Sequence, residues 1–255
     1  MKSYGLENKV VLITGINNPQ GMGAATAYAF AREKAKLVLV YKRIFQEFDK
    51  NKINKNGEDR YRALNAGSAD VVENKIKEIN ADYIVLESDI SNENSVEEIY
   101  STALKKYGKV DILVNNAAVG DSYESDTIKK ITQNIIDEIF AVNVRGNILM
   151  MREFIRHCGD YGRIINISTD AAQSFVGRIV YGASKASLEA LTRSIALEIA
   201  ESGITVNCVA PGPTQTGWID TDFEKKIISG GIKMFILPLP SGLKFLWGDR
   251  GNIFL

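Results

Sequence analysis

A tyrosine and a lysine four residues apart, Tyr181 and Lys185, have the clearest chemical potential in this sequence. On a helix, side chains at this spacing lie on one face, so the phenol and the ammonium would be neighbours. A free phenol has a pKa of about 10 and is a poor proton donor at neutral pH. A nearby cation favours the phenolate and lowers that pKa. The pair therefore predicts a general acid for a carbonyl oxygen, the alternative being an ordinary surface pair on a helix.

A turn with several glycines follows the first apolar run of the chain. Thr14 and Gly15 end that run, and Gly21 and Gly23 come shortly after. Glycines at such a junction let the backbone turn sharply and approach a pyrophosphate, and the helix that begins near Gly21 would offer free N–H groups to the phosphates. The sequence therefore predicts a dinucleotide site here, although a tight turn before a helix is the alternative.

Two basic residues, Lys42 and Arg43, follow the second apolar run. Sites that prefer NAD usually place an acidic residue at this point, on the ribose hydroxyls of the adenosine. A lysine or arginine would instead pair with a 2′-phosphate. We therefore expect NADP(H) to be preferred, with NAD(H) possible. The alternative is that both side chains simply solvate the start of a long polar loop, Arg43–Asn65.

Short apolar runs alternate with stretches of helical periodicity along most of the chain. The predicted strands are Val10–Thr14, Leu37–Tyr41, Tyr83–Glu87, Ile112–Val114, Ile164–Ile167 and Ile204–Val209. The predicted helices are Ala24–Arg32, Asp70–Ile79, Ser95–Tyr107 with Ser95 as a possible cap, Asp137–Arg156 and Tyr181–Glu201. Strands that are apolar on both faces and separated by helices indicate a parallel sheet covered on both sides. The predicted fold is a doubly wound, Rossmann-type α/β sheet in a single domain.

The composition excludes several classes of function. Lys+Arg and Asp+Glu both total 31, so we expect no nucleic-acid partner. The single histidine, His157, leaves no multi-histidine metal site and is expected at a helix end, away from catalysis. The two cysteines suggest a reducing compartment. No apolar run is long enough to span a membrane and no signal peptide is seen, so we expect a cytoplasmic protein with no membrane partner.

Six motifs in a fixed order resemble the short-chain dehydrogenase/reductase family, and in particular the bacterial 3-oxoacyl-acyl-carrier-protein reductases. The similarity covers about Lys9 to Gly217. The motifs are Thr14-Gly15 with Gly21-x-Gly23, Asn115-Asn116-Ala117-Ala118, Asn143, Ser168-Thr169, Tyr181-x-x-x-Lys185 and Pro211-Gly212-Pro213. The glycine turn is longer than usual, with five residues between Gly15 and Gly21, and its Asn17 could donate a hydrogen bond where other members use a basic residue.

The resemblance implies a role for each matching residue. Tyr181 would be the acid/base, Lys185 would hold the nicotinamide ribose and lower the pKa of Tyr181, and Asn143 would anchor a water of a proton relay. Asn115 and Ala117 would line the cofactor channel, and Asp89 with Ile90 would lie by the adenine. The residues expected to close over the nicotinamide are Pro211, Gly212 and Thr214.

The resemblance also implies a hydroxyl that binds the substrate carbonyl, and two neighbours compete for this role. Counting 13 residues back from Tyr181 gives Ser168. Aligning the preceding strand gives Thr169 instead. Adjacent strand residues face opposite sides, so only one can face the substrate. Ser168 is slightly preferred, and Thr169 is kept as the alternative.

The end of the chain departs from the family pattern. After Met234 the family has another helix and a last strand, whereas Pro238 and Pro240 oppose a helix here. We expect the last strand to be missing or altered, by truncation or replacement. The chain then divides into a Rossmann-type domain with the catalytic residues, 1–232, and an atypical tail, 233–255. Related proteins form tetramers through this region, so a homo-oligomer (tetramer or dimer) is expected if the tail permits it.

Together these features predict an NAD(P)H-dependent oxidoreductase. It would transfer hydride between nicotinamide and a small-molecule carbonyl or secondary alcohol, with a 3-oxoacyl thioester as one candidate substrate. The intact Ser/Tyr/Lys set favours an active enzyme. The altered tail leaves two alternatives, namely a non-catalytic dinucleotide-binding homologue and a truncated, poorly active reductase.

Overall fold

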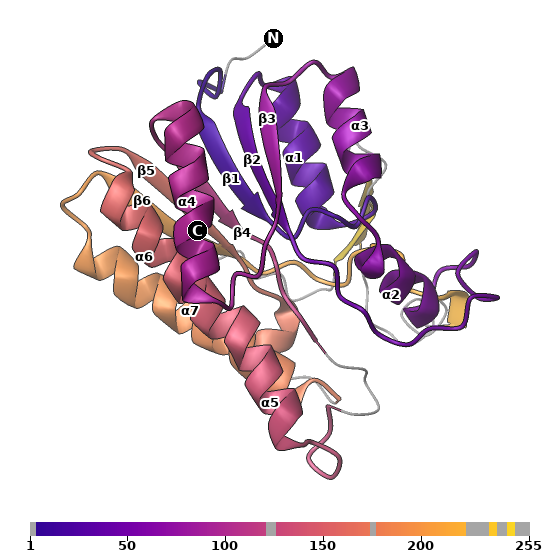
Figure 1. Ribbon diagram of the computed structural model, residues 1–255. Coiled ribbons are helices and arrows are strands. Elements are labelled where there is room, and N and C mark those ends of the chain that lie inside the picture. The colour runs from indigo at the N-terminus through magenta and orange to yellow at the C-terminus, as the bar shows by residue number, and fades with distance from the viewer. Residues whose placement is uncertain (1–3, 121–125, 174–176, 223–234, 239–243, 248–255) are drawn as a thin grey trace.

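A six-stranded parallel sheet forms the centre of the molecule (Figure 1). The computed structural model describes residues 4–120, 126–173, 177–222, 235–238 and 244–247. The strand order is β3-β2-β1-β4-β5-β6. The strands are β1 (Val10–Thr14), β2 (Lys36–Tyr41), β3 (Tyr83–Glu87), β4 (Ile112–Asn115), β5 (Gly162–Ile167) and β6 (Ile204–Val209). The predicted strands are confirmed, each within two residues at either end.

The sheet is doubly wound, as the sequence predicts. The chain runs outward from β1 through β2 to β3, and then returns to the other side of β1 to add β4, β5 and β6. Val11 therefore pairs with Leu37 on one side and with Ile112 on the other. All five residues of β1 are buried, because helices cover both faces of the sheet. The reversal of strand order between β1 and β4 opens a crevice at the carboxyl ends of these strands, where such folds bind ligands.

The helices form two layers, one on each face of the sheet (Figure 1). Apolar residues of α1 and α3 pack on one face, and those of α4, α6 and α7 pack on the other. The helices of the described residues are α1 (Met22–Arg32), α2 (Glu58–Ala66), α3 (Asp70–Glu78), α4 (Glu93–Tyr107), α5 (Gln133–Phe140), α6 (Asn147–His157) and α7 (Ile179–Glu198). Two short helices are added, the π-helix η1 (Ala141–Gly146) and the 3₁₀ helix η2 (Asp170–Ala172).

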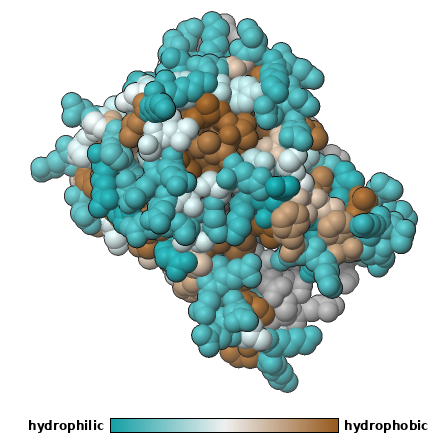
Figure 2. Space-filling model, in the orientation of Figure 1, coloured by the Kyte–Doolittle hydropathy of each residue, from teal (hydrophilic) through white to brown (hydrophobic). Residues whose placement is uncertain are grey.

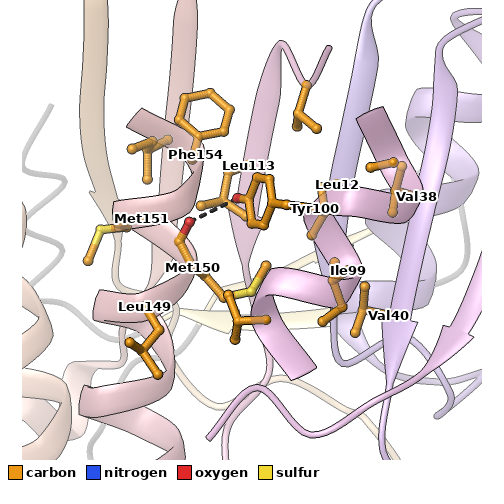
Figure 3. Close-up of a cluster of buried hydrophobic side chains, with 14 of the residues drawn as sticks. Leu12, Val38, Val40, Ile99, Tyr100, Leu113, Leu149, Met150, Met151 and Phe154 are labelled. Atoms are coloured by element: carbon orange, nitrogen blue, oxygen red, sulfur yellow. Dashed lines mark hydrogen bonds between the residues drawn. The ribbon is translucent and has the colours of Figure 1, made fainter. Parts of the chain in front are cut away.

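The core beneath α4 and α6 is closely packed around one buried phenol (Figure 3). Tyr100 of α4 is 1% exposed, and its hydroxyl donates a hydrogen bond to the carbonyl of Met150 across 2.9 Å. Phe154 and Leu113 complete the layer between these helices and the sheet. Burial gives the fold most of its stability, while the single hydrogen bond removes the penalty of an unsatisfied hydroxyl. Polar side chains dominate the outer surface of the face in view (Figure 2).

The stretch after β2 corrects one prediction. Arg43–Asn65 is not a loop throughout, because α2 begins inside it at Glu58. No residue of α2 is buried, and its polar composition hides the helical pattern. The helix is instead held at its start, where the Gly57 N–H donates to the Gly217 carbonyl across 2.8 Å. Long-range contacts, and not an apolar face, therefore stabilise this segment.

Two helix boundaries also differ from the prediction. Asn92, and not Ser95, caps α4, and the Asn92 side chain accepts a hydrogen bond from the Ser95 N–H. The long helix expected over Asp137–Arg156 is instead three segments, α5, η1 and α6, with the π-helical turn in the middle. Such wide turns insert one residue into a helix and often occur at functional sites.

The tail has short strands of its own. β7 (Phe235–Pro238) and β8 (Lys244–Trp247) pair with each other in antiparallel fashion. Within the described residues, the parallel sheet ends at β6. The rest of the predicted tail, 233–255, lies outside the described residues, so the division of the chain at 232 stays a prediction. None of the helices that the structure describes has the length and apolar character needed to cross a membrane.

Candidate active site

A cavity of about 460 Å³ lies at the carboxyl ends of the strands, across the β1/β4 crevice. The predicted residues that line it are Thr14, Gly15, Asn17, Gly21, Lys42, Arg43, Asp89, Ile90, Ala117, Ser168, Tyr181 and Lys185. The structure thus brings together most of the predicted cofactor and catalytic residues. The predicted residues outside this lining are Gly23, Asn115, Asn143, Thr169, Pro211, Gly212 and Thr214.

The glycine turn between β1 and α1 is packed too closely for side chains. Gly15 has a φ of +74°, and a Cβ there would lie 2.7 Å from the Ala117 Cα. A Cβ on Gly23 would lie 2.3 Å from the Gly15 carbonyl oxygen, so Gly23 serves the contact between helix and strand instead of lining the cavity. Gly21 immediately precedes α1 and has no side chain to cap it. The first N–H groups of α1 are therefore available to an anion at the cavity wall.

The extra residues of the glycine turn fasten it to other segments. The Asn17 amide donates to the carbonyls of Asn65 and Gly67, across 2.8 and 3.0 Å. The Asn18 amide donates to the Thr216 carbonyl across 3.2 Å. Both amides thus hold the turn against the end of α2 and against the segment after β6. The donors left for an anion at this turn are therefore main-chain N–H groups more than these side chains.

Both basic residues after β2 are paired with carboxylates. The Lys42 ammonium lies 2.6 Å from Asp89, and the Arg43 Nε donates to Glu87 across 2.7 Å. The hydrogen bond from Arg43 holds the pKa of Glu87 below its ordinary value. Burial acts to raise the pKa of Asp89, but the hydrogen bonds from Lys42 and Ser91 outweigh it and leave that pKa lowered. Lys42 is 55% exposed, so solvent screens these pairs and they can exchange partners readily.

The tyrosine and the lysine of α7 meet at the cavity, as the spacing predicts. The Lys185 ammonium lies 5.9 Å from the centre of the Tyr181 ring. Lys185 is only 2% exposed, and its Nζ donates to the Ile167 carbonyl at the end of β5 across 2.7 Å. Burial lowers the pKa of this ammonium to about 8. The Arg178 guanidinium also lies near the phenol, 5.5 Å from the ring centre.

The two candidate hydroxyls have different partners. The Ser168 hydroxyl lines the cavity and donates to the Glu189 carboxylate of α7 across 2.6 Å, and Ser168 is 2% exposed. Thr169 is half-buried, and its hydroxyl donates to Asp170 across 3.1 Å. The Thr169 oxygen also accepts a hydrogen bond from the Ala171 N–H, which caps η2. Both hydroxyls therefore donate to carboxylates, and the Ser168 bond is the shorter and the more buried of the two.

Asn143 lies in the π-helical turn and connects the loop after β4 to α7. Its side chain exchanges two hydrogen bonds of 2.9 Å with the N–H and carbonyl of Val119. The Asn143 amide also donates to the Ser184 hydroxyl across 3.0 Å. Its own carbonyl accepts from the Asn147 amide across 2.7 Å. Asn143 is fully buried, and these contacts assign it a role in holding two segments together.

The remaining predicted residues support the site from outside the cavity. Asn115 is buried, and its amide donates to the Asn166 side chain across 2.9 Å. The Pro211 carbonyl accepts from the Asp170 N–H, which places the segment after β6 beside η2. The Thr214 hydroxyl donates to the Gly212 carbonyl across 3.0 Å and stabilises a local turn.

Several residues of this region were not found by sequence reasoning. Ile44, Phe45 and Tyr61 of the segment after β2 line the cavity, although that segment looks like an exposed loop in sequence. Asp126 is fully buried and contacts the start of α7. A lone acidic residue in a loop carries no signal for such a contact, because its partners are more than 50 residues away in sequence.

The fold and the lining define a protein with a dinucleotide-type crevice and a tyrosine–lysine pair at its edge. A family model described as enoyl-(acyl carrier protein) reductase matches residues 60–229. The NADPH-dependent aldehyde reductase 1, chloroplastic, of Arabidopsis thaliana is 32% identical over 231 residues, which cover 90% of this chain and 74% of that protein. Versicolorin reductase of Emericella nidulans is 30% identical over 216 residues, covering 84% and 72%.

A solved structure agrees with these sequence matches. A short-chain dehydrogenase from Burkholderia cenocepacia in complex with NADP has a TM-score of 0.70 and 27% identity, covering 87% of this chain and 82% of that one. This chain therefore belongs to the short-chain dehydrogenase/reductase family of oxidoreductases.

Proposed function

We propose that this protein is an NADPH-dependent reductase of small carbonyl compounds, able to run in reverse on secondary alcohols. The observation that carries the proposal is the Tyr181–Lys185 pair, which lies on the wall of the cavity that the glycine turn also lines. A binding protein without turnover has no need for a phenol beside a buried ammonium. The alternative of a non-catalytic homologue is therefore disfavoured.

The cavity residues fit a dinucleotide. Gly15 and Gly21 line the cavity and would let the backbone approach a pyrophosphate closely, while Gly23 lets α1 pack against the end of β1. Lys42 and Arg43 would hold the 2′-phosphate of NADP(H) after exchanging it for their carboxylates, while NAD(H) would leave those ion pairs intact. Asp89 and Ile90 would lie by the adenine, and Ala117 by the nicotinamide end. When bound, the reduced nicotinamide supplies the hydride that the carbonyl carbon takes.

The protein's own residues supply the proton and the polar surroundings. Tyr181 donates its phenolic proton to the substrate oxygen, so that the C=O bond becomes an alcohol and the tyrosine becomes a phenolate. The Lys185 ammonium stabilises this phenolate by its charge, and solvent then returns the proton. For the hydroxyl that binds the substrate oxygen, we infer Thr169 more than Ser168. Both hydroxyls donate to a carboxylate, but the Ser168 bond to Glu189 is short and buried, whereas the half-buried Thr169 has a longer bond to Asp170 that a substrate oxygen can replace.

The substrate class is the finer part of the proposal. The Arabidopsis relative is named as an aldehyde reductase and the Emericella relative as a versicolorin reductase. Aldehydes and ketones are therefore the first compounds to test. A 3-oxoacyl thioester belongs in the same panel, because the family model that matches carries an acyl-carrier-protein reductase description.

We also propose that the protein is a homo-oligomer and is located in the cytoplasm. Light scattering would check the oligomeric state, and cell fractionation would check the location.

The experiment that tests the function compares wild-type protein with Tyr181→Phe. NADPH oxidation is followed with aldehydes, ketones and a 3-oxoacyl thioester, and NADPH binding is measured separately by fluorescence. We expect turnover of at least one carbonyl by the wild type, a loss of about 10²-fold or more in kcat for Tyr181→Phe, and unchanged NADPH binding. NADPH binding without any Tyr181-dependent turnover would support the non-catalytic alternative. No binding and a broad thermal melt would support the poorly active one.

A further inference from the structure

Asp126 is a buried carboxylate that forms no salt bridge within the described residues. It lies in the connection between β4 and α5 and is 0% exposed. Its two oxygens accept hydrogen bonds from the N–H groups of Val180 and Tyr181, across 2.7 and 3.1 Å. Its carbonyl accepts a longer one, 3.4 Å, from the Ile179 N–H. An isolated buried charge is strongly unfavourable, so these contacts must stabilise the carboxylate.

The contacts match what the start of a helix requires. The first N–H groups of a helix have no partner within it, and the positive end of the helix dipole attracts an anion. Arg178, the residue that precedes α7, gives no side-chain cap. Asp126 caps the helix from a segment distant in sequence, because it accepts hydrogen bonds from the N–H groups of the first three residues of α7.

Tyr181 is held from its other side as well. The Ser184 hydroxyl donates to the Tyr181 carbonyl across 2.7 Å, and the Asn143 amide donates to that hydroxyl across 3.0 Å. The N–H and the carbonyl of Tyr181 are thus both bonded to side chains. With its backbone fixed in this way, the phenol has only its own side-chain torsions left to vary.

We propose that Asp126 is a positioning residue that sets where the Tyr181 phenol meets the substrate oxygen. The inference rests on the proposed acid/base function of Tyr181. A displacement of about 1 Å in a reacting group can lower a rate by about 10²-fold, so the placement of this helix end matters for turnover. The effect should fall on kcat, because Asp126 is not part of the cavity lining that would hold the dinucleotide.

The test compares Asp126→Ala and Asp126→Asn with the control Asn92→Ala. Asparagine keeps one acceptor oxygen, whereas alanine keeps none. Asn92 caps α4 by accepting from the Ser95 N–H and does not line the cavity, so its loss reports the effect of a missing helix cap alone. For each variant we would measure the thermal midpoint and the Kd for NADPH. The kcat and KM for the best carbonyl substrate of the panel would be measured at saturating NADPH.

We expect Asp126→Ala to lower kcat by about tenfold or more, and Asp126→Asn to lower it less, with the NADPH Kd within about twofold of wild type. Asn92→Ala should lower the thermal midpoint and leave kcat within about twofold. If Asp126→Ala does not fold, the kcat of Asp126→Asn decides. A kcat within about twofold of wild type in the folded Asp126 variants, or an equal loss in Asn92→Ala, would overturn the inference. Failure of the proposed function would show instead as unchanged turnover in Tyr181→Phe.

Discussion

The two ends of the cavity are built in different ways. At the end near β2 and β3, Lys42 and Arg43 stand in partly exposed ion pairs with Asp89 and Glu87. At the end near α7, Lys185 is almost fully buried and bonded to a main-chain carbonyl. Exposed pairs exchange partners at little expense in free energy, whereas buried polar groups hold one geometry. The first arrangement suits selection of a ligand, and the second suits placement of a reacting group.

The largest effect on activity is expected at the buried end of the cavity, from a substitution of Lys185. Lys185→Met should lower kcat/KM by about 10²-fold or more, because the phenolate of Tyr181 loses its cation. Steady-state kinetics with NADPH and the best carbonyl would measure this. A loss below about tenfold would mean that Arg178, which also lies near the ring, supplies most of the positive charge.

The same variant tests the burial of the ammonium. The folded-state pKa of about 8 lies below the ordinary value of 10.5, so the unfolded chain binds more protons between these two pH values. The contribution of Lys185 to the unfolding free energy therefore rises with pH over this window, by on the order of 3 kcal/mol in total. Denaturant unfolding of wild type and Lys185→Met at pH 7.5, 9 and 10.5 would measure the difference, which should move in favour of wild type as pH rises. A constant difference would show that the ammonium is not desolvated.

The two candidate hydroxyls give the next effect. Thr169→Ala should lower kcat by roughly 10²-fold, as the removal of one donor to a developing oxyanion does elsewhere. Ser168→Ala should lower it less and reduce the thermal midpoint, because the Glu189 carboxylate loses its partner. The two measurements together decide the role. The reverse order of effects would return the catalytic hydroxyl to Ser168.

At the exposed end the expected effect is smaller. Lys42→Ala should raise the KM for NADPH by roughly tenfold and leave the KM for NADH nearly unchanged, since only NADPH carries the 2′-phosphate. Added salt should reduce the difference between the KM values of the wild type for NADPH and NADH, because it screens the charge of the 2′-phosphate. Lys52→Ala is the matched control, because Lys52 belongs to the same segment but pairs with Asp49. Equal effects on both cofactors would mean that Lys42 does not recognise the 2′-phosphate.

The smallest effect concerns the attachment of α2. Asn17→Ala removes the two hydrogen bonds to the Asn65 and Gly67 carbonyls and should reduce the unfolding free energy by about 1–2 kcal/mol. The control variant is Asn51→Ala, because Asn51 is an exposed asparagine in the stretch Arg43–Asn65 that contains α2. Calorimetry of both variants would measure the difference. Equal midpoints would show that α2 is held by its other contacts.

The sheet and the placement of Tyr181 and Lys185 on one helix face could be predicted because their signals are local. Strands buried on both faces must be continuously apolar, and β1 shows this over all five residues. The spacing of Tyr181 and Lys185 fixes a common helix face wherever the helix lies. The glycine turn could also be predicted, from the spacing of its glycines after the first apolar run. The structure gives the reason for this spacing, because a Cβ on Gly15 or Gly23 would clash with neighbouring backbone.

The features that escaped prediction depend on contacts between distant residues. α2 has no buried residue, so its helix depends on the Gly57–Gly217 hydrogen bond and on Asn17. The partner of Ser168, Glu189, lies on another element, and nothing in the sequence connects them. Asp126 is one of 31 acidic residues, and only the fold shows that it binds the start of α7.

Asn116 joins the ends of β1 and β4 at the floor of the cavity. Its amide donates to the carbonyls of Thr14 and Gly15, across 2.8 and 2.9 Å, and its N–H donates to the Thr14 hydroxyl across 3.1 Å. These bonds lock the glycine turn before any ligand arrives. Binding of a dinucleotide would therefore cost little conformational entropy of the turn. The association rate should be set by diffusion more than by loop rearrangement.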